Sequence, residues 1–106
     1  MLQLGAMRTY TVVLSPEPDT DWFSVSCPAM PGVASQGLGR EQAMKNIREA
    51  MDLWLEVTLE EGGTPLEETP ELIAKQVQFV LGWKAEEGWP LIVETAQVSL
   101  AKVAAA

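Results

Sequence analysis

The amino-acid sequence predicts an α+β fold in which a three- to four-stranded, mostly antiparallel sheet packs against one long helix. Three observations lead to this prediction. Two segments that alternate polar and apolar residues come first, a run rich in proline and glycine follows, and a helix with a clear apolar face comes directly after it. A further apolar segment and a closing strand complete the order β-β-β-α-(α)-β, and 106 residues fit a single domain.

The first two strands are expected to form a hairpin. Arg8 to Leu14 alternates with a period of two and is rich in β-branched residues, which is typical of a strand. Ser15 to Asp21 holds two prolines and acidic residues suited to a turn, and Trp22 to Ser26 alternates again. Residues Met1 to Ala6 are expected to be a disordered extension, so that the domain begins at Met7.

The run from residue 27 to residue 37 is expected to turn the chain between strands. Proline fixes φ and lacks a backbone N–H, and glycine reaches conformations that other residues avoid. The residues to which we assign this shaping role are Pro28, Pro31, Gly32 and Gly37. A short third strand, Val33 to Gln36, lies within this run.

A long helix is predicted from Arg40 to Glu60. Its apolar residues recur at intervals of three and four, which places them on one face. They are Ala43, Ile47, Ala50, Met51, Trp54 and Thr58, with Met44 and Leu55 widening the stripe. Gly39 is an acceptable N-cap, and Gly62-Gly63 ends the helix. Of the four tryptophans in the chain, most are expected to be core anchors, and the alternative is that one or two lie at an interface.

The last third of the chain is less definite. Thr64 to Glu68 is expected to be a linker in which Glu67-Glu68 is solvated charge. Thr69-Pro70 is a good helix start, and residues 70–86 favour a helix, although the uniformly apolar stretch within them leaves a strand open. Leu91 to Leu100 is predicted to be the closing strand. Residues 7–103 are thus expected to form one domain, with a core of 7–68 and an extension of 69–103.

The charge balance narrows the classes of partner. The formal net charge is −8, which weighs against binding to nucleic acid or to an anionic membrane surface. It favours a basic partner, or serves solubility alone. No run of apolar residues is long enough for a membrane span, and the first residues do not resemble a signal peptide, so we expect a cytoplasmic protein.

The chain offers little for catalysis. It has no histidine and one cysteine, Cys27, which excludes the common catalytic triads, an internal disulfide and a cysteine-rich zinc site. Glu17, Asp19 and Asp21 lack the spacing of a calcium loop and are better explained as a solvated turn. We therefore expect no catalytic residue, no metal, no cofactor and no enzymatic activity.

Taken in order, these segments resemble the HicB-like antitoxins, whose core domain is a truncated RNase H-like fold. The resemblance covers about residues 7 to 68. It is carried by Tyr10 to Leu14, Trp22-Phe23-Ser24-Val25, Pro28-x-x-Pro31-Gly32, Gln36-Gly37, and the helix that begins Glu41-Gln42-Ala43 and continues Asn46-Ile47-Arg48-Glu49-Ala50. Members often add a C-terminal domain that binds an operator, but the residues after Glu68 are neither basic nor patterned for DNA-groove entry.

The resemblance implies a protein that binds and masks a small basic toxin, HicA, which is an mRNA-cleaving ribonuclease. The acidic balance suits such a partner. By charge and exposure, the residues expected to contact it are Asp19, Asp21 and Trp22, whose other interpretation is a solvated turn with Trp22 on the sheet. A stand-alone domain that binds another protein or assembles with itself is the alternative. A homodimer or homotetramer is expected, because a small sheet leaves edges that need covering.

Overall fold

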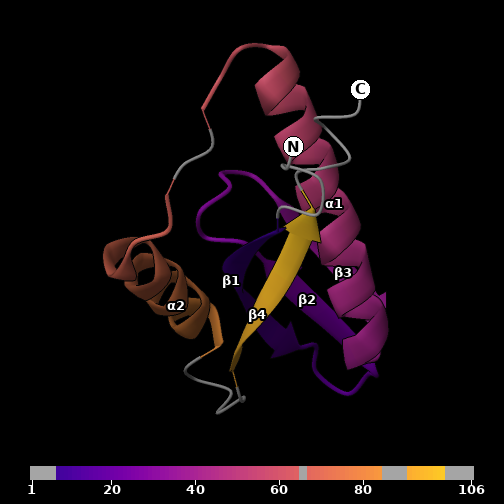
Figure 1. The fold of residues 1–106 in the computed structure, drawn as a ribbon. Helices are drawn as coiled ribbons and strands as arrows, with labels where there is room; N and C mark the ends of the chain where they lie inside the picture. The colour runs from indigo at the N-terminus through magenta and orange to yellow at the C-terminus, as the bar shows by residue number, and fades with distance from the viewer. Residues whose placement is uncertain (1–6, 65–66, 85–90, 100–106) are drawn as a thin grey trace.

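A computed structural model gives the fold of the chain, and it describes residues 7–64, 67–84 and 91–99 (Figure 1). The predicted α+β class is confirmed. The described elements are β1 (Met7–Pro16), β2 (Trp22–Ser26), β3 (Ala34–Leu38), α1 (Arg40–Glu60), α2 (Pro70–Lys84) and β4 (Ile92–Ser99). The expected N-terminal extension, residues 85–86 of the predicted second helix and the end of the predicted closing strand lie outside the described residues.

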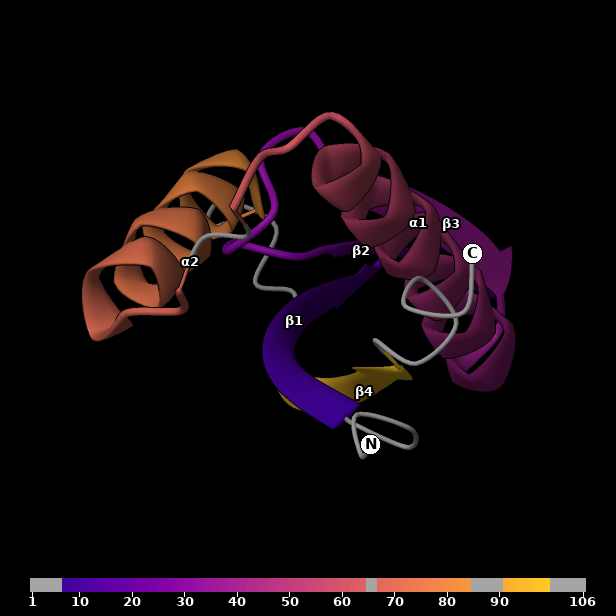
Figure 2. The ribbon, with the colours of Figure 1, turned by 45° about the horizontal axis from the view of Figure 1, so that its top comes forward.

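The four strands form one antiparallel sheet in the order β3-β2-β1-β4. β4 pairs with β1 along eight residues, from Met7↔Ser99 to Leu14↔Ile92, whereas β2 pairs only with Val13 to Pro16 of β1. β4 therefore lies at the margin of the sheet, on the side of β1 away from β2 (Figure 2). The third strand lies one to two residues later than predicted, because its pairing with β2 runs from Ala34 to Leu38.

Helix α1 covers one face of the sheet and makes the core with it. The side chains that α1 buries are Ala43, Met44, Ile47, Met51 and Leu55. They pack against the apolar side chains of the sheet, which are Tyr10, Val12, Leu14, Val25, Ala96 and Val98. Trp54 is only partly buried at the margin of this core, and Trp22 is 42% exposed. Trp54 thus packs against the core from its margin, whereas Trp22 is not a core anchor, because aliphatic and methionine side chains fill the space between helix and sheet.

The start of α1 lies directly against β3, and Gly37 makes this possible. A Cβ atom at Gly37 would lie 2.4 Å from the backbone nitrogen of Ala43. Gly37 pairs with Phe23 within β3, so the prediction that it supplies φ freedom in a turn is wrong, and its role is steric. Gly39 has a φ of 84° and no side-chain cap. Instead, the Gln42 side chain accepts a hydrogen bond from the Leu38 N–H at 2.6 Å.

Helix α2 covers part of the opposite face, which settles the choice between helix and strand for this segment. The Thr69 hydroxyl caps it by accepting the Leu72 N–H at 3.2 Å. The Gln76 amide donates to the Ser26 hydroxyl at 2.8 Å, and Ser26 faces away from α1 because its neighbour Val25 faces the core. The sheet thus runs between the two helices (Figure 1).

The segment that leads into α2 is bonded to β1. The Glu68 carboxylate accepts hydrogen bonds from the backbone N–H of Thr11 and from its hydroxyl, the latter at 2.9 Å. The expectation that Glu68 is solvated linker charge is therefore wrong. Its carboxylate takes the place of a strand neighbour where β1 extends beyond its pairing with β2.

Candidate protein-binding surface

The proline-glycine loop forms two consecutive β-turns. The Met30 N–H donates to the Cys27 carbonyl at 3.1 Å, and the Val33 N–H donates to the Met30 carbonyl at 3.0 Å. Pro28 and Pro31 each occupy the second position of their turn, and Gly32, with a φ of 80°, occupies the third position of the second turn. Proline followed by a glycine of positive φ is the pattern of a type II turn.

Metal-ligand geometry and the state of the one cysteine can both be read from the described residues. Within them, no three His, Cys, Asp or Glu side chains gather as metal ligands. Cys27, the first residue of the proline-glycine loop, is buried, and burial raises the pKa of its thiol to about 11. A neutral, enclosed thiol is a poor nucleophile.

Two apolar side chains, Trp22 and Leu38, are exposed beside the turn between β1 and β2. Trp22 of β2 pairs with Leu38 of β3, and the two residues are 42% and 54% exposed. Exposed Asp19 and Asp21 precede Trp22 directly in the turn, and the Asp21 carbonyl accepts the Gly39 N–H at 2.7 Å. We call Trp22, Leu38, Asp19 and Asp21 the Trp22 patch. The sequence prediction named three of its residues but missed Leu38, which only the β2–β3 register brings beside Trp22.

A groove lies on the same sheet face as Trp22. Ser24 and Ser26 alternate with the core residue Val25 and line the groove together with Val13. Phe79 and Val80 of α2 form its other wall, and its volume is about 230 Å³. The Trp22 patch and a mainly apolar hollow thus share one face of the sheet, and exposed apolar surface of this kind is typical of protein-binding sites.

A second apolar groove lies on the α1 side of the molecule. Leu53, Trp54 and Val57 of α1 line it with Gly32 and Val33 of the proline-glycine loop, around a volume of about 350 Å³. Leu53 is 61% exposed. The proline-glycine loop thus forms one wall of this groove, and no acidic side chain lines the groove.

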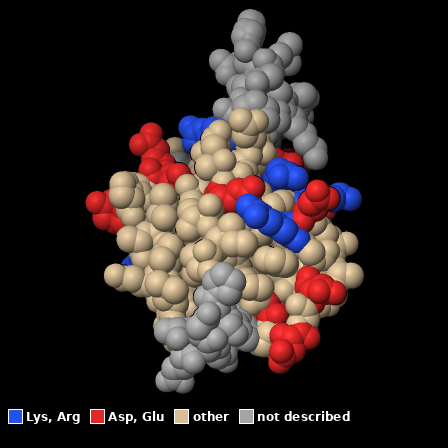
Figure 3. Space-filling model, turned by 90° about the horizontal axis from the view of Figure 1, so that it is seen from below, with Lys and Arg blue, Asp and Glu red and all other residues tan. Residues whose placement is uncertain are grey.

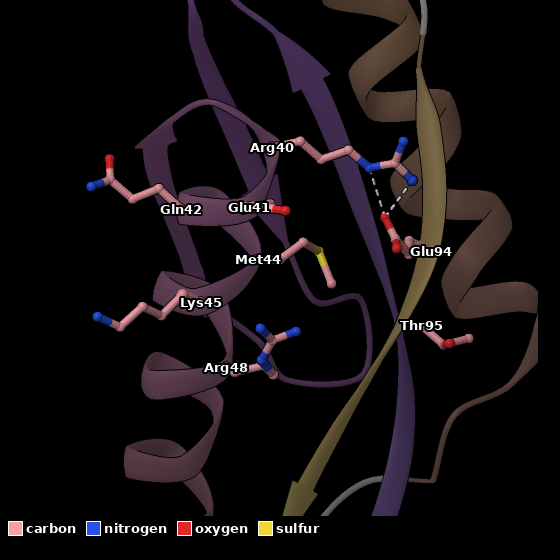
Figure 4. Close-up of a pocket in the computed structure, with 8 residues that line it drawn as sticks. All are labelled: Arg40, Glu41, Gln42, Met44, Lys45, Arg48, Glu94 and Thr95. Atoms are coloured by element: carbon pink, nitrogen blue, oxygen red, sulfur yellow. Dashed lines mark hydrogen bonds and ion pairs between the residues drawn. The ribbon is translucent and has the colours of Figure 1, made fainter.

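A larger hollow of about 800 Å³ lies between α1 and β4, and both basic and acidic side chains line it (Figure 4). Arg40 and Arg48 point from α1 toward β4, whereas Lys45 points away. Arg40 makes an ion pair of 2.6 Å with Glu94. On the face seen in Figure 3, basic side chains lie beside acidic ones and form no uninterrupted basic area of the kind that tracks a phosphate backbone.

No described helix is long and apolar enough to span a membrane.

Comparison with known proteins shows which sequences and folds this chain is similar to. A UPF0150 protein of Thermoplasma acidophilum is 36% identical over 47 residues, which are 44% of this chain and 67% of the relative. A chain of a toxin-antitoxin complex from Streptococcus pneumoniae has a similar fold, with a TM-score of 0.69 and 16% identity over 92% of this chain and 72% of the other. The N-terminal domain of the antitoxin HicB from Burkholderia pseudomallei is 26% identical, with a TM-score of 0.55, over 82% of this chain and 95% of the domain.

The sequence also matches the family described as the HicB-like antitoxin of bacterial toxin-antitoxin systems, over residues 10–103. This match includes α2 and β4 as well as the segments on which the resemblance rests. The chain belongs to the HicB-like antitoxin family.

Proposed function

We propose that this chain is an antitoxin that binds and masks a small basic HicA-like toxin, and that it acts by binding rather than by catalysis. The observation that carries the proposal is the Trp22 patch, in which an exposed Trp22–Leu38 pair is bordered by Asp19 and Asp21. Family membership and the similarity to a chain of a toxin-antitoxin complex support it.

The two parts of the patch would serve different steps of binding. Tryptophan is enriched among the few residues that dominate interface energies, and Leu38 widens the apolar contact that it offers. The two aspartates add to a formal net charge of −8, which would speed the encounter with a basic protein and disfavour acidic ones. Tight binding then depends on Trp22, and fast binding depends on the acidic turn.

We further propose that residues 7–103 act as one unit in the cytoplasm without direct contact to nucleic acid. The bond from Gln76 to Ser26 and the pairing of β4 with β1 support a single domain, because they tie the extension to the core sheet.

Binding is tested with the product of a small basic reading frame encoded beside this chain. The two proteins are mixed, and gel filtration with light scattering and calorimetry measure the mass and the affinity. Trp22→Ala is expected to weaken binding by about 30-fold or more, since truncation of a central aromatic costs about 2 kcal/mol or more. Asp19→Lys with Asp21→Lys is expected to slow association and to weaken its dependence on salt.

Leu53→Ala is the matched control, because it removes another exposed apolar side chain on the α1 side. Its affinity should stay within about threefold of the wild type, by the rule that most exposed contacts are nearly neutral. If Leu53→Ala abolishes binding and Trp22→Ala does not, the Trp22 patch is the wrong surface. If the folded chain forms no complex at all, it is a stand-alone binding or self-assembling domain.

A further inference from the structure

Trp22 and Leu38 face each other across β2 and β3 without a backbone hydrogen bond between them. In an antiparallel ladder, facing residues alternate between pairs that exchange backbone bonds and pairs whose backbone groups point outward. The Leu38 N–H points away from β2, because it donates to the Gln42 side chain at 2.6 Å. The Trp22 carbonyl points the other way and accepts the Glu17 N–H at 2.8 Å. The pair is therefore of the outward-pointing kind, in which the side chains of the two strands lie closest.

A side chain of α1 restrains the Leu38 half of this pair. Gln42 lies in the first turn of α1 and points away from β4 (Figure 4). Its amide oxygen accepts the Leu38 N–H and so links the last residue of β3 to the start of the helix. The next N–H along the chain, that of Gly39, donates to the Asp21 carbonyl at 2.7 Å and closes the β2–β3 ladder beyond the pair. Leu38 is thus held on the side that faces away from β2.

A side chain of the turn between β1 and β2 restrains the Trp22 half. The Thr20 hydroxyl accepts the Trp22 N–H at 3.1 Å and donates to the Glu17 carbonyl at 3.3 Å. The Glu17 N–H in turn donates to the Trp22 carbonyl. Both backbone groups of Trp22 are therefore bonded within the turn, and a hydroxyl supplies one of the two bonds.

We propose that Gln42 and Thr20 are positioning residues, which hold the Trp22–Leu38 pair in the arrangement that the partner contacts. They bond to the backbone on opposite sides of the pair, so neither of them is part of its apolar surface. A surface that is already in its bound arrangement loses less conformational freedom on binding, and this raises the affinity. The inference rests on the proposed toxin binding and assigns to it two polar residues that need not touch the toxin.

Asn46 separates such positioning from general stability. Its amide donates to the Gln36 carbonyl at 2.7 Å, so Asn46 also links α1 to the outer edge of β3. Gln36 faces Ser24, two residues before Leu38 along β3. Asn46→Ala therefore removes a bond between the same helix and the same strand without releasing Leu38. Gln42→Ala and Asn46→Ala should lower the urea midpoint to a similar extent, whereas only Gln42→Ala should loosen the pair.

Binding is measured by calorimetry with the HicA-like protein encoded beside this chain, at about 0.5 M salt, which screens the effect of an added charge. Gln42→Ala and Thr20→Val are each expected to weaken binding about fivefold, as the loss of one hydrogen bond implies. Gln42→Glu and Thr20→Ser keep the accepting oxygen. Both are expected to bind within about twofold of the wild type, as is Asn46→Ala, because Trp22 and Leu38 stay in place.

The free chain gives a readout that does not need the toxin. Its tryptophans are replaced by 5-fluorotryptophan, and the fluorine resonance of Trp22 is assigned by its absence in Trp22→Phe. Gln42→Ala and Thr20→Val are expected to shift or broaden this resonance. Gln42→Glu and Thr20→Ser are expected to restore it, and Asn46→Ala is expected to leave it unchanged.

The outcomes for positioning and for toxin binding can be told apart. If the toxin binds Gln42→Ala and Thr20→Val as tightly as the wild type, the positioning role is overturned. It is also overturned if Asn46→Ala weakens binding as much as Gln42→Ala, since general stability then explains the loss. If the wild type forms no complex, the proposed function fails and the fluorine spectra decide alone. A Trp22 resonance unchanged in both variants then overturns the positioning role, and a shifted resonance supports it.

Discussion

Substitution of Gly37 by alanine should be among the most damaging small changes in this domain. The added Cβ would lie 2.4 Å from the backbone nitrogen of Ala43, 2.6 Å from the carbonyl carbon of Gln42 and 2.7 Å from the Cα of Ala43. All three atoms are backbone, so no side-chain rotation relieves the clash. An ordinary contact begins near 3.4 Å, and the start of α1 would therefore have to move about 1 Å away from β3.

The cost follows from what this displacement disturbs. Overpacking of this kind lowers the free energy of unfolding by about 1–3 kcal/mol. The displacement would also weaken the hydrogen bonds of Gln42 to Leu38 and of Asn46 to Gln36, and the loss of each costs about 1 kcal/mol. Gly37→Ala is thus expected to lower the free energy of unfolding by about 3–5 kcal/mol, a large share of the 5–15 kcal/mol typical of a domain.

Urea unfolding followed by tryptophan fluorescence measures the change, and two other glycines provide controls. Gly82 lies in α2 with open space around it, so Gly82→Ala should stabilise by about 0.5–1 kcal/mol through helix propensity. Gly32 has a φ of 80° and open space, so Gly32→Ala should cost only the strain of about 1–2 kcal/mol. If the free energy of unfolding of Gly37→Ala lies within about 1 kcal/mol of the wild-type value, α1 does not approach β3 as closely as 2.4 Å from a Cβ at position 37.

Three further predictions concern single side chains. Glu68→Ala should lower the free energy of unfolding by about 1–3 kcal/mol, because the Thr11 N–H loses its acceptor; an unchanged urea midpoint would show that water replaces the carboxylate without loss. Arg40→Ala should cost less than about 1 kcal/mol in thermal unfolding, since its ion pair with Glu94 is solvent-exposed, and a larger loss would indicate a buried role. Cys27 should resist a thiol reagent at pH 8 until the chain unfolds, and fast labelling of the native protein would contradict its burial. The contribution of this thiol to the free energy of unfolding should be complete below pH 9, the ordinary thiol pKa. It should then be lost as the pH rises toward 11, where the raised folded-state pKa lies.

Local patterns in the sequence were sufficient for most of the secondary structure. The helix from Arg40 to Glu60 and the strand from Trp22 to Ser26 have the predicted bounds, because their periodicities are long or bordered by clear turn residues. The strand predicted as Leu91 to Leu100 is observed as Ile92–Ser99. For residues 70–84, apolar composition alone fits either a helix or a strand, and the helix is stabilised by its Thr69 cap and by its contact with the sheet.

What could not be predicted depends on contacts between residues far apart in the chain. The steric role of Gly37 needs the position of Ala43, and the bonding of Glu68 needs the free half of β1. Leu38 joins the Trp22 patch only through the β2–β3 register. None of these pairs carries a local signal, so Trp22 and its aspartates could be named as candidates from exposure and charge, but not the surface they form.

Inhibition of the toxin tests the proposed function most directly. The HicA-like protein encoded beside this chain is incubated with an mRNA, and the chain is added in increasing molar ratio. We predict that cleavage falls to background at a fixed stoichiometric ratio, and that Trp22→Ala requires at least about tenfold more protein, as loss of an interface anchor implies. Undiminished cleavage at a large excess of folded wild-type chain would contradict the account.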